Sequence, residues 1–141
     1  MEIKFRSTCP ISSALDIVGD KWSLLILRDI MFSGKKTFGE FASSPEGIAT
    51  NILSDRLRNL EKSGIITKRK LPDNKKTNVY SLTEKGITFL PLLVEVILWS
   101  NKNLQEHITE STKELAGRIN KSKDNFVNSM FDKLRNEILI K

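Results

Sequence analysis

The sequence has very little cysteine and histidine, the residues from which many catalytic sites, metal sites and disulfides are built. Its 141 residues include one cysteine and one histidine. A single cysteine excludes an internal disulfide, which fits a reducing cytosol. No Cys, His, Asp and Glu residues stand at metal-site spacing, no glycine-rich phosphate loop follows a predicted strand, and no Ser/His/Asp or paired-carboxylate arrangement is present. We therefore expect no enzyme, no metal and no other cofactor.

Long apolar runs are missing too. No stretch approaches the roughly 20 apolar residues that span a bilayer. The opening MEIKFRSTCP has no apolar core of the signal-peptide type. We expect a cytoplasmic protein that makes no membrane contact. The length suits one domain with a helical extension.

Positive charge, in contrast, is abundant and local. The net charge is +6, and residues 48–80 hold eight Lys or Arg against three acids, a net +5. Nearly the whole excess therefore lies in under a quarter of the chain. This concentration favours a surface for a polyanion over a generic solvated coat.

Hydrophobic periodicity predicts a mainly helical chain. Helices are expected over 11–19, 21–34, 36–44, 49–63, 84–101 and 109–140, of which 21–34 is central and buried. Thr37 and Thr83 are expected to cap helices, and Gly64 to end one. Pro91 should kink the 84–101 helix or leave a local gap in its hydrogen bonds. On the 49–63 helix, the inward face is expected to be Ile52 or Leu53, with Leu57 and Leu60.

A basic hairpin follows the 49–63 helix. Residues 65–67 and 78–82 are rich in β-branched and aromatic residues, and the turn between them, 68–77, is rich in lysine. The short 36–44 helix, a glycine-containing turn and the polar-faced 49–63 helix form a helix-turn-helix candidate. The expected fold class is mainly α with a small β-hairpin wing: a dimeric winged helix-turn-helix.

This arrangement suits double-stranded DNA, with the helix in a major groove and the wing on phosphates. Asn51 can contact adenine and Arg58 guanine, while Arg56 and Arg58 can grip phosphate instead. The expected DNA-binding residues of the helix are Thr50, Asn51, Ser54, Asp55, Arg56 and Arg58. The alternative is that they are ordinary solvent-facing residues.

Phosphate contacts are expected from the wing and from the third helix. The wing would supply Lys68, Arg69, Lys70, Lys75 and Lys76. Lys36 and Thr37 would meet a phosphate through the start of the 36–44 helix. For each lysine taken singly, the alternative is a solvated surface charge.

The 84–101 helix is apolar on nearly all sides, which one winged domain cannot bury. A partner subunit is the simplest second surface that could bury this helix. We therefore expect a homodimer held by the N-terminal segment, this helix and the tail. Paired recognition helices read half-sites about 34 Å apart, which predicts a pseudo-palindromic operator. The competing interpretation is that the 109–140 helix folds back and covers this surface within one chain.

Cys9 precedes Pro10, which is favoured as the first residue of a helix. A thiol at a helix N-terminus lies where the helix dipole favours the thiolate, as in sensors of oxidants or electrophiles. With no second cysteine, it can pair across a dimer, form a mixed disulfide or be alkylated. The alternative is a small residue packed at the dimer seam with no chemistry.

Four blocks of the chain resemble the HxlR-type transcriptional regulators, relatives of the MarR group. The blocks are CPISSALDIVGDKWSLLILRDI, TFGEF, GIATNILSDRLRNLEKSGII and VYSLTEKG, between Cys9 and Trp99. The resemblance implies a dimeric winged-helix regulator of bacterial transcription, with 9–101 as the family domain and 102–141 as a C-terminal helical extension. Several such regulators respond to oxidants, quinones or aldehydes through the cysteine at the position of Cys9.

Three positions depart from the family pattern. Asp20 replaces the second glycine of a Gly-Gly-Lys-Trp stretch, Ala49 stands where a serine cap is common, and 75–77 replaces a usual proline. A repressor is the expected role rather than an activator. The alternatives are a regulator with an inert Cys9 that answers another signal, and a winged helix used as a protein-interaction module.

Overall fold

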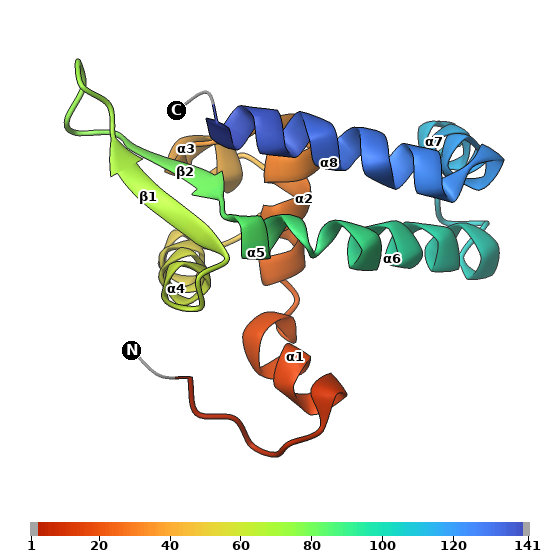
Figure 1. Cartoon of the computed structure of the whole chain (residues 1–141), viewed down its shortest axis with the longest axis horizontal. Coiled ribbons are helices and arrows are strands. Elements are labelled where there is room, and N and C mark those ends of the chain that lie inside the picture. Colours follow the sequence, from red (N-terminus) through yellow and green to blue (C-terminus); the bar gives the residue numbers. More distant parts are fainter. Residues whose placement is uncertain (1–2, 140–141) are drawn as a thin grey trace. The chain divides into compact units, whose positions relative to one another are not determined.

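The computed structural model describes residues 3–139. Its elements are α1 (Pro10–Val18), α2 (Ser23–Ser33), α3 (Phe38–Ala42), α4 (Thr50–Lys62), β1 (Ile66–Lys70), β2 (Asn78–Leu82), α5 (Glu84–Ile87), α6 (Leu90–Asn103), α7 (Glu110–Lys121) and α8 (Lys123–Leu139) (Figure 1). Contacts divide the chain into two compact units between Gly86 and Ile87. The predicted fold class, mainly helical with a hairpin wing, is confirmed.

The first unit is built from α1 to α4 and the hairpin. Helix α4 contacts α2, α3 and β1, and β1 pairs with β2 in antiparallel register from Ile66–Leu82 to Lys70–Asn78. Phe41 and Tyr80 meet edge to face with centroids 6.1 Å apart, which joins α3 to β2. The buried apolar residues of this unit include Val18, Ile26, Leu27, Ile30, Met31, Phe41, Leu53, Leu57, Leu60, Ile65, Ile66, Val79, Tyr80 and Leu82.

Local signals placed the first four helices well. Thr37 caps α3 as predicted, and it forms a capping box with Glu40. Leu53, rather than Ile52, joins Leu57 and Leu60 on the buried face of α4. Phe38 is only half-buried, because it lines a groove described below.

The hairpin is longer than predicted. Strand β1 continues through Lys70, so three residues assigned to the turn belong to the ladder, and the turn shrinks to 71–77. The basic side chains did not break the strand, since they are exposed and each of these residues pairs in register with a residue of β2. Asn74 closes the turn: its Oδ1 accepts from the Lys76 amide at 3.2 Å, and its Nδ2 donates to Thr77 Oγ1 at 2.9 Å.

Gly86 marks a close approach of the backbone to Ile65, the residue before β1. A Cβ at this position would lie 2.1 Å from the carbonyl oxygen of Ile65, which no side chain tolerates. Thr83 fixes the same junction, since its hydroxyl donates to the Gly64 carbonyl at 2.5 Å and accepts from the Gly86 amide at 3.0 Å. The predicted cap at Thr83 is confirmed.

The prediction of one continuous helix over 84–101 is wrong, because the structure has two helices there. The chain forms α5, which ends at Ile87, and α6, which starts at Leu90 with Pro91 in its first turn. Proline has no N–H, and its ring clashes with the carbonyl four residues earlier, so it begins a helix more readily than it continues one.

The second unit holds α6, α7 and α8, which contact one another pairwise. The predicted single tail helix is wrong: Ser122 is extended and separates α7 from α8, where it acts as a new cap. Ile140, the predicted end of that helix, lies outside the described residues. Ala116, Ile119 and Leu134 are buried, and Lys123 Nζ lies 2.6 Å from Glu95 Oε1. Within residues 3–139, every helix is too short or too polar to cross a membrane.

Helix α6 therefore groups with the two C-terminal helices. The predicted division into a domain over 9–101 and an extension over 102–141 rests on sequence resemblance and is not tested by this packing.

Candidate nucleic-acid interface

Helix α4 presents a polar face opposite its buried one. Thr50, Asn51, Ser54 and Arg58 are all exposed on it. Leu53, Leu57 and Leu60 anchor the other side, so the helix is held by its core and leaves these polar groups free to meet a ligand. Its N-terminal turn is the part that a recognition helix presents first to base edges.

Asp55 lies on the same face and organises the two arginines beside it. Its carboxylate is 2.8 Å from Arg56 Nη1 and 3.6 Å from Arg58 Nη1, and it accepts from Asn59 Nδ2 at 3.3 Å. The pair with Arg58 spans one turn of the helix. Asp55 therefore restrains the side chain that is best suited to guanine.

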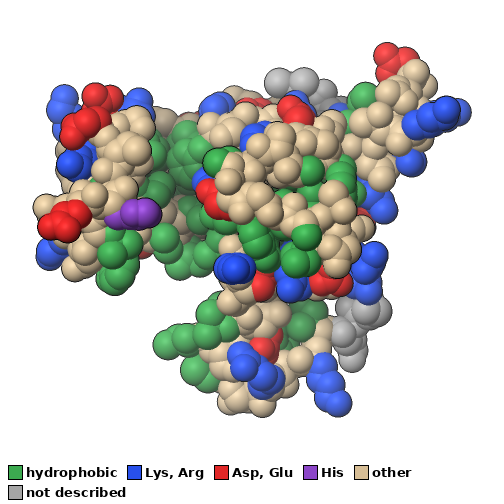
Figure 2. Space-filling model, turned by 180° about the vertical axis from the view of Figure 1, so that it is seen from behind, with side chains coloured by type: hydrophobic (Ala, Val, Ile, Leu, Met, Phe, Trp, Pro, Cys, Tyr) green, Lys and Arg blue, Asp and Glu red, His purple; other side chains and the backbone are tan. Residues whose placement is uncertain are grey.

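The wing distributes its charges over two faces. Lys68 pairs across the ladder with Tyr80, and Lys70 with Asn78, whereas Arg69 pairs with Val79. Because side chains alternate along a strand, Lys68 and Lys70 share one face and Arg69 takes the other. Lys75 and Lys76 are exposed in the turn. Figure 2 shows Lys and Arg side chains along this projecting hairpin, at the upper right.

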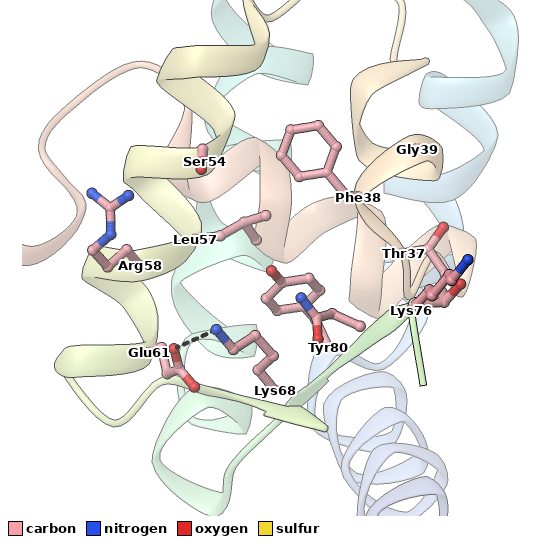
Figure 3. A pocket seen from close by; sticks show the side chains of 12 residues that line it. Thr37, Phe38, Gly39, Ser54, Leu57, Arg58, Glu61, Lys68, Lys76 and Tyr80 are labelled. Atoms are coloured by element: carbon pink, nitrogen blue, oxygen red, sulfur yellow. Dashed lines mark ion pairs between the residues drawn. The ribbon is translucent and has the colours of Figure 1, made fainter. Parts of the chain in front are cut away.

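A groove of about 540 Å³ lies between α3, α4 and the wing (Figure 3). Phe38, Leu57 and Tyr80 form its apolar part, and its charged lining residues come from both α4 and the wing: Arg58, Glu61, Lys68 and Lys76. Of the predicted contacts, Thr37, Ser54, Arg58, Lys68 and Lys76 line this one groove, and the others lie outside its lining.

Glu61 and Tyr80 are among the groove residues that the sequence-based prediction missed. Glu61 lies 3.9 Å from Lys68 Nζ, which links α4 to β1. Burial, together with the Glu61 charge, raises the pKa of the Tyr80 hydroxyl, so this group is neutral at pH 7. The signal for Glu61 was its position one turn beyond Arg58 on the same helix face.

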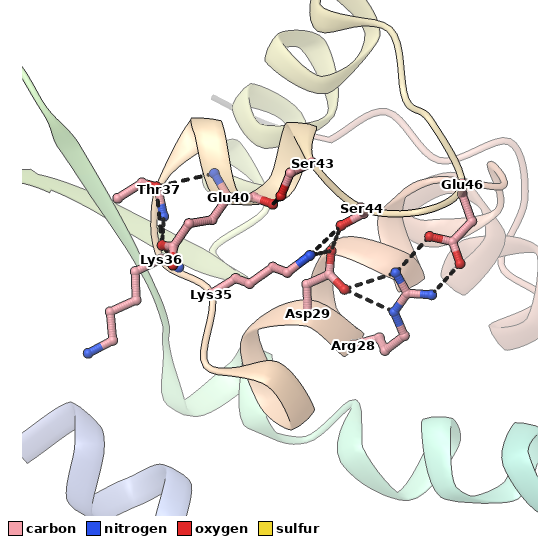
Figure 4. Close-up of polar contacts among 9 residues, drawn as sticks. All are labelled: Arg28, Asp29, Lys35, Lys36, Thr37, Glu40, Ser43, Ser44 and Glu46. Carbon is pink, nitrogen blue, oxygen red and sulfur yellow. Dashed lines mark hydrogen bonds and ion pairs between the residues drawn. The ribbon is translucent and has the colours of Figure 1, made fainter. Parts of the chain in front are cut away.

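The start of α3 is already occupied. The Lys36 and Thr37 amides donate to Glu40 Oε1 at 3.0 and 3.1 Å, and Thr37 Oγ1 accepts from the Glu40 amide. These bonds hold the pKa of Glu40 below its ordinary value, so a carboxylate fills the place predicted for a phosphate. The side chain of Lys36 points away from this box (Figure 4) and stays a predicted phosphate contact.

Arg56 faces away from Ser54, because residues two apart on a helix are about 200° apart. It lies in a hollow of about 310 Å³ with residues of α1 and the α1–α2 turn, where its Nε is 3.0 Å from Asp20 Oδ2. The structure thus turns Arg56 toward α1 and the α1–α2 turn, although it keeps its ion pair with Asp55.

Asp20, the departure from the family's glycine, has a structural role. It accepts from the Trp22 and Ser23 amides at 3.0 and 2.9 Å, which caps the start of α2. Burial raises its pKa, but these bonds, the Ser23 hydroxyl and the Arg56 charge together hold the pKa below its ordinary value. Among the described residues, only glycines have a positive φ, so the backbone at Asp20 is one that any residue can adopt. This turn therefore does not need the glycine of the family pattern.

Ala49 takes the N-cap position of α4 in extended conformation, and its methyl group cannot accept a hydrogen bond. We expect Ala49→Ser to raise the free energy of unfolding by about 1 kcal/mol, since a serine oxygen would accept from an amide of the first turn. Urea unfolding would measure it. Ala42→Ser, inside α3, is the control and should not stabilise. An unchanged midpoint for Ala49→Ser would contradict the prediction.

Cys9 is exposed and occupies the N-cap position of α1. Its amide donates to Ser7 Oγ at 3.2 Å, and its carbonyl accepts from the Ser13 amide at 2.9 Å. The thiol is therefore accessible to solvent. Among the described residues, no three His, Cys, Asp or Glu side chains gather as metal ligands.

A family model described as HxlR-like helix-turn-helix matches residues 17–108. The regulator sll1512 of Synechocystis, named an HTH-type transcriptional regulator, is 37% identical over 86 residues. This match spans 61% of the chain and 63% of sll1512, just under two thirds of that relative. YodB of Bacillus subtilis, also an HTH-type transcriptional regulator, is 30% identical over 98 residues, or 69% of this chain and 87% of YodB. These relatives and the family are transcriptional regulators, not enzymes.

Solved structures agree with the sequence matches. The reduced form of YodB superimposes with a TM-score of 0.58 at 28% identity, over 72% of this chain and all of YodB. YodB is also known in quinone-bound and diamide-treated forms. A MarR-family regulator of Listeria monocytogenes in complex with a 26mer DNA has a TM-score of 0.58 at 25% identity, over 83% of this chain and 77% of that one.

Proposed function

This chain belongs to the HxlR-like helix-turn-helix family of transcriptional regulators, and we propose that it binds a specific DNA duplex through α4 and the wing. The observation that carries this proposal is one groove that is lined both by Ser54 and Arg58 of the exposed polar face of α4 and by Lys68 and Lys76 of the wing. In the Listeria relative, a regulator of similar fold is bound to DNA. The protein would act in the cytoplasm.

The residues divide by role. Thr50, Asn51, Ser54 and Arg58 would contact base edges, and Asp55 would orient Arg58 or accept from cytosine. Lys36, Lys68, Arg69, Lys70, Lys75 and Lys76 would contact phosphates. We assign Arg56 and Thr37 to the fold, since Arg56 is ion-paired with Asp20 and Asp55 and Thr37 is bonded to Glu40 in the capping box.

We also propose a homodimer on a pseudo-palindromic operator. Helix α6 exposes Leu92, Val96 and Trp99 along one face, by 42%, 44% and 59%. These residues recur at the i, i+4, i+7 spacing of one helical stripe. Helix α1 exposes Ile11 by 73% and Leu15 by 53%. A second copy of the chain would cover such apolar faces and would pair two recognition helices.

Finally, we propose a repressor whose DNA binding is lost when Cys9 reacts. The support is an exposed thiol and the reduced, quinone-bound and diamide-treated forms of YodB. Two Cys9 thiols of a dimer would form a disulfide by giving two electrons and two protons to an oxidant of the diamide class. With a quinone, the thiolate sulfur would instead add to a ring carbon, and the ring would take up the proton.

Fluorescence anisotropy tests these proposals together. The wild type and Cys9→Ser would be titrated against DNA from upstream of the gene and a scrambled duplex, reduced and after diamide treatment. We expect selective binding that oxidation lowers at least tenfold in the wild type, and that Cys9→Ser retains. Selective binding that ignores oxidation in both proteins would discard the thiol switch and keep the regulator. Absence of selectivity on any duplex from a random pool would contradict specific DNA binding and favour a protein-interaction module.

A further inference from the structure

Helix α2 carries two charged residues in an otherwise apolar sequence, Arg28 and Asp29. Asp29 is only 4% exposed, although it is ionisable. Its carboxylate accepts from the Ser44 hydroxyl and lies 2.9 Å from Arg28 Nη2 and 3.7 Å from Lys35 Nζ. Lys35 also donates to Ser44 Oγ at 2.8 Å. A buried carboxylate with this many partners is held in one geometry.

Arg28 extends this network to the turn before α4. Its two terminal nitrogens donate to the two carboxylate oxygens of Glu46 at 2.6 and 2.9 Å, a bidentate pair (Figure 4). The hydrogen bonds from Arg28 hold the pKa of Glu46 below its ordinary value, so the pair stays charged at pH 7. We call Arg28, Asp29, Lys35, Ser44 and Glu46 the turn clamp. It joins α2 to both Ser44 and Glu46 in the α3–α4 turn.

The α3–α4 turn depends on contacts from outside itself to fix its conformation. Gly47 has φ +72°, a left-handed conformation that glycine adopts easily. Because glycine adopts many other backbone conformations as well, it does not by itself fix the path of the turn. Ala49 offers the first turn of α4 no side-chain cap. Thr50 and Asn51, the first residues proposed to meet bases, follow directly. The direction in which α4 leaves the turn therefore depends on contacts made by its neighbours.

We infer that the turn clamp positions the first turn of α4 for reading DNA without touching the DNA itself. The inference rests on the proposed function, because it assigns the clamp to base selectivity. A misdirected helix start would displace Thr50 and Asn51 from base edges, whereas phosphate contacts of the wing would remain. Loss of the clamp should thus lower binding to the operator and spare binding to unrelated DNA.

The test uses Glu46→Gln, Arg28→Gln and the double variant in the full chain. Glu110→Gln is the matched control, since it also removes one carboxylate from an ion pair, that with Lys113 on α7. Each protein would be titrated against the operator selected by the wild type and against scrambled DNA, at several salt concentrations. Hydrogen exchange of amides 53–57 in the free protein gives a second readout that needs no DNA. Thermal melts would confirm that each variant is folded at the assay temperature.

We expect the ratio of operator to scrambled affinity to fall about tenfold per half-site in Glu46→Gln, the effect of one mismatched base pair. Exchange at 53–57 should quicken about tenfold, in line with a local opening. The double variant should lose no more than Arg28→Gln alone, because the only contact of the clamp that Glu46 makes is with Arg28, and Arg28→Gln already removes it. Glu110→Gln should keep the wild-type ratio.

Two results would overturn the inference while leaving the proposed function intact. One is an unchanged ratio and unchanged exchange in Glu46→Gln. The other is an Arg28→Gln variant that binds both duplexes more weakly, with a salt slope reduced by about 0.9, since that is the signature of an arginine that binds a phosphate directly. A wild type that selects no duplex would overturn the proposed function and the selectivity role of the clamp. Exchange would then still report whether the clamp holds α4.

Discussion

Replacing Arg69, Lys70, Lys75 and Lys76 with glutamine should lower DNA affinity about a hundredfold or more and reduce its dependence on salt. Each side chain that no longer neutralises a phosphate takes about 0.9 from the slope of log K against log salt, so four of them account for up to about 3.6 per protomer. All four side chains are exposed on or beside the wing, where no core contact depends on them. Anisotropy titrations from about 50 to about 300 mM salt would give both the affinity and the slope, since DNA affinity changes strongly over this range.

The control for this variant is Lys102, Lys113, Lys121 and Lys133 replaced by glutamine. These exposed lysines belong to the second unit, and their replacement lowers the net charge by the same amount. If the wing makes phosphate contacts, only the wing variant should lose slope. Equal losses in both variants would mean that net charge alone drives binding, and an unchanged slope in the wing variant would show that the wing is not a DNA contact.

Val96→Glu combined with Trp99→Glu should convert the protein to a monomer and weaken operator binding by about 10² or more. Both side chains lie on the exposed stripe of α6, and a charge placed in an apolar interface must lose its hydration without gaining a partner. The DNA effect follows from the lost bivalency of two linked recognition helices. Sedimentation equilibrium would show a mass falling from twice the chain mass to 16.0 kDa.

Leu104→Glu is the matched control for the dimer. Leu104 is 43% exposed and follows the last turn of α6, off the stripe of Leu92, Val96 and Trp99. It should leave the mass unchanged. A double variant that remains dimeric would place the interface elsewhere, with Ile11 and Leu15 of α1 as the next residues to test. A wild type that is monomeric at micromolar concentration would refute the dimer.

Where the sequence predicted structure well, the signals were local. The Thr37–Glu40 capping box, Gly64 after α4 and Thr83 before α5 each act within a few residues. The same holds for the polar face of α4, because residues three and four apart share a helix side whatever surrounds it. Pro91 was a local signal too, and its effect was underestimated: it starts α6 instead of bending one long helix.

Residue roles were harder to predict where a partner lies far along the chain. Arg56 and Arg58 look alike in sequence, yet Arg56 turns to Asp20, 36 positions earlier, while Arg58 stays on the open face. Arg28 and Asp29 carried a usable signal, as charges within an apolar helix, but their partners Ser44 and Glu46 were not evident. Packing of α2 against the α3–α4 turn decides these pairings.

The sequence by itself determined that this protein is a winged helix with one polar helix face and a basic hairpin, because periodicity, capping and charge are properties of short segments. The tertiary structure alone decided which charges stay exposed and which are paired inside the fold. An ion pair forms only when the backbone brings two side chains within about 4 Å, and that distance depends on how helices far apart in sequence pack together.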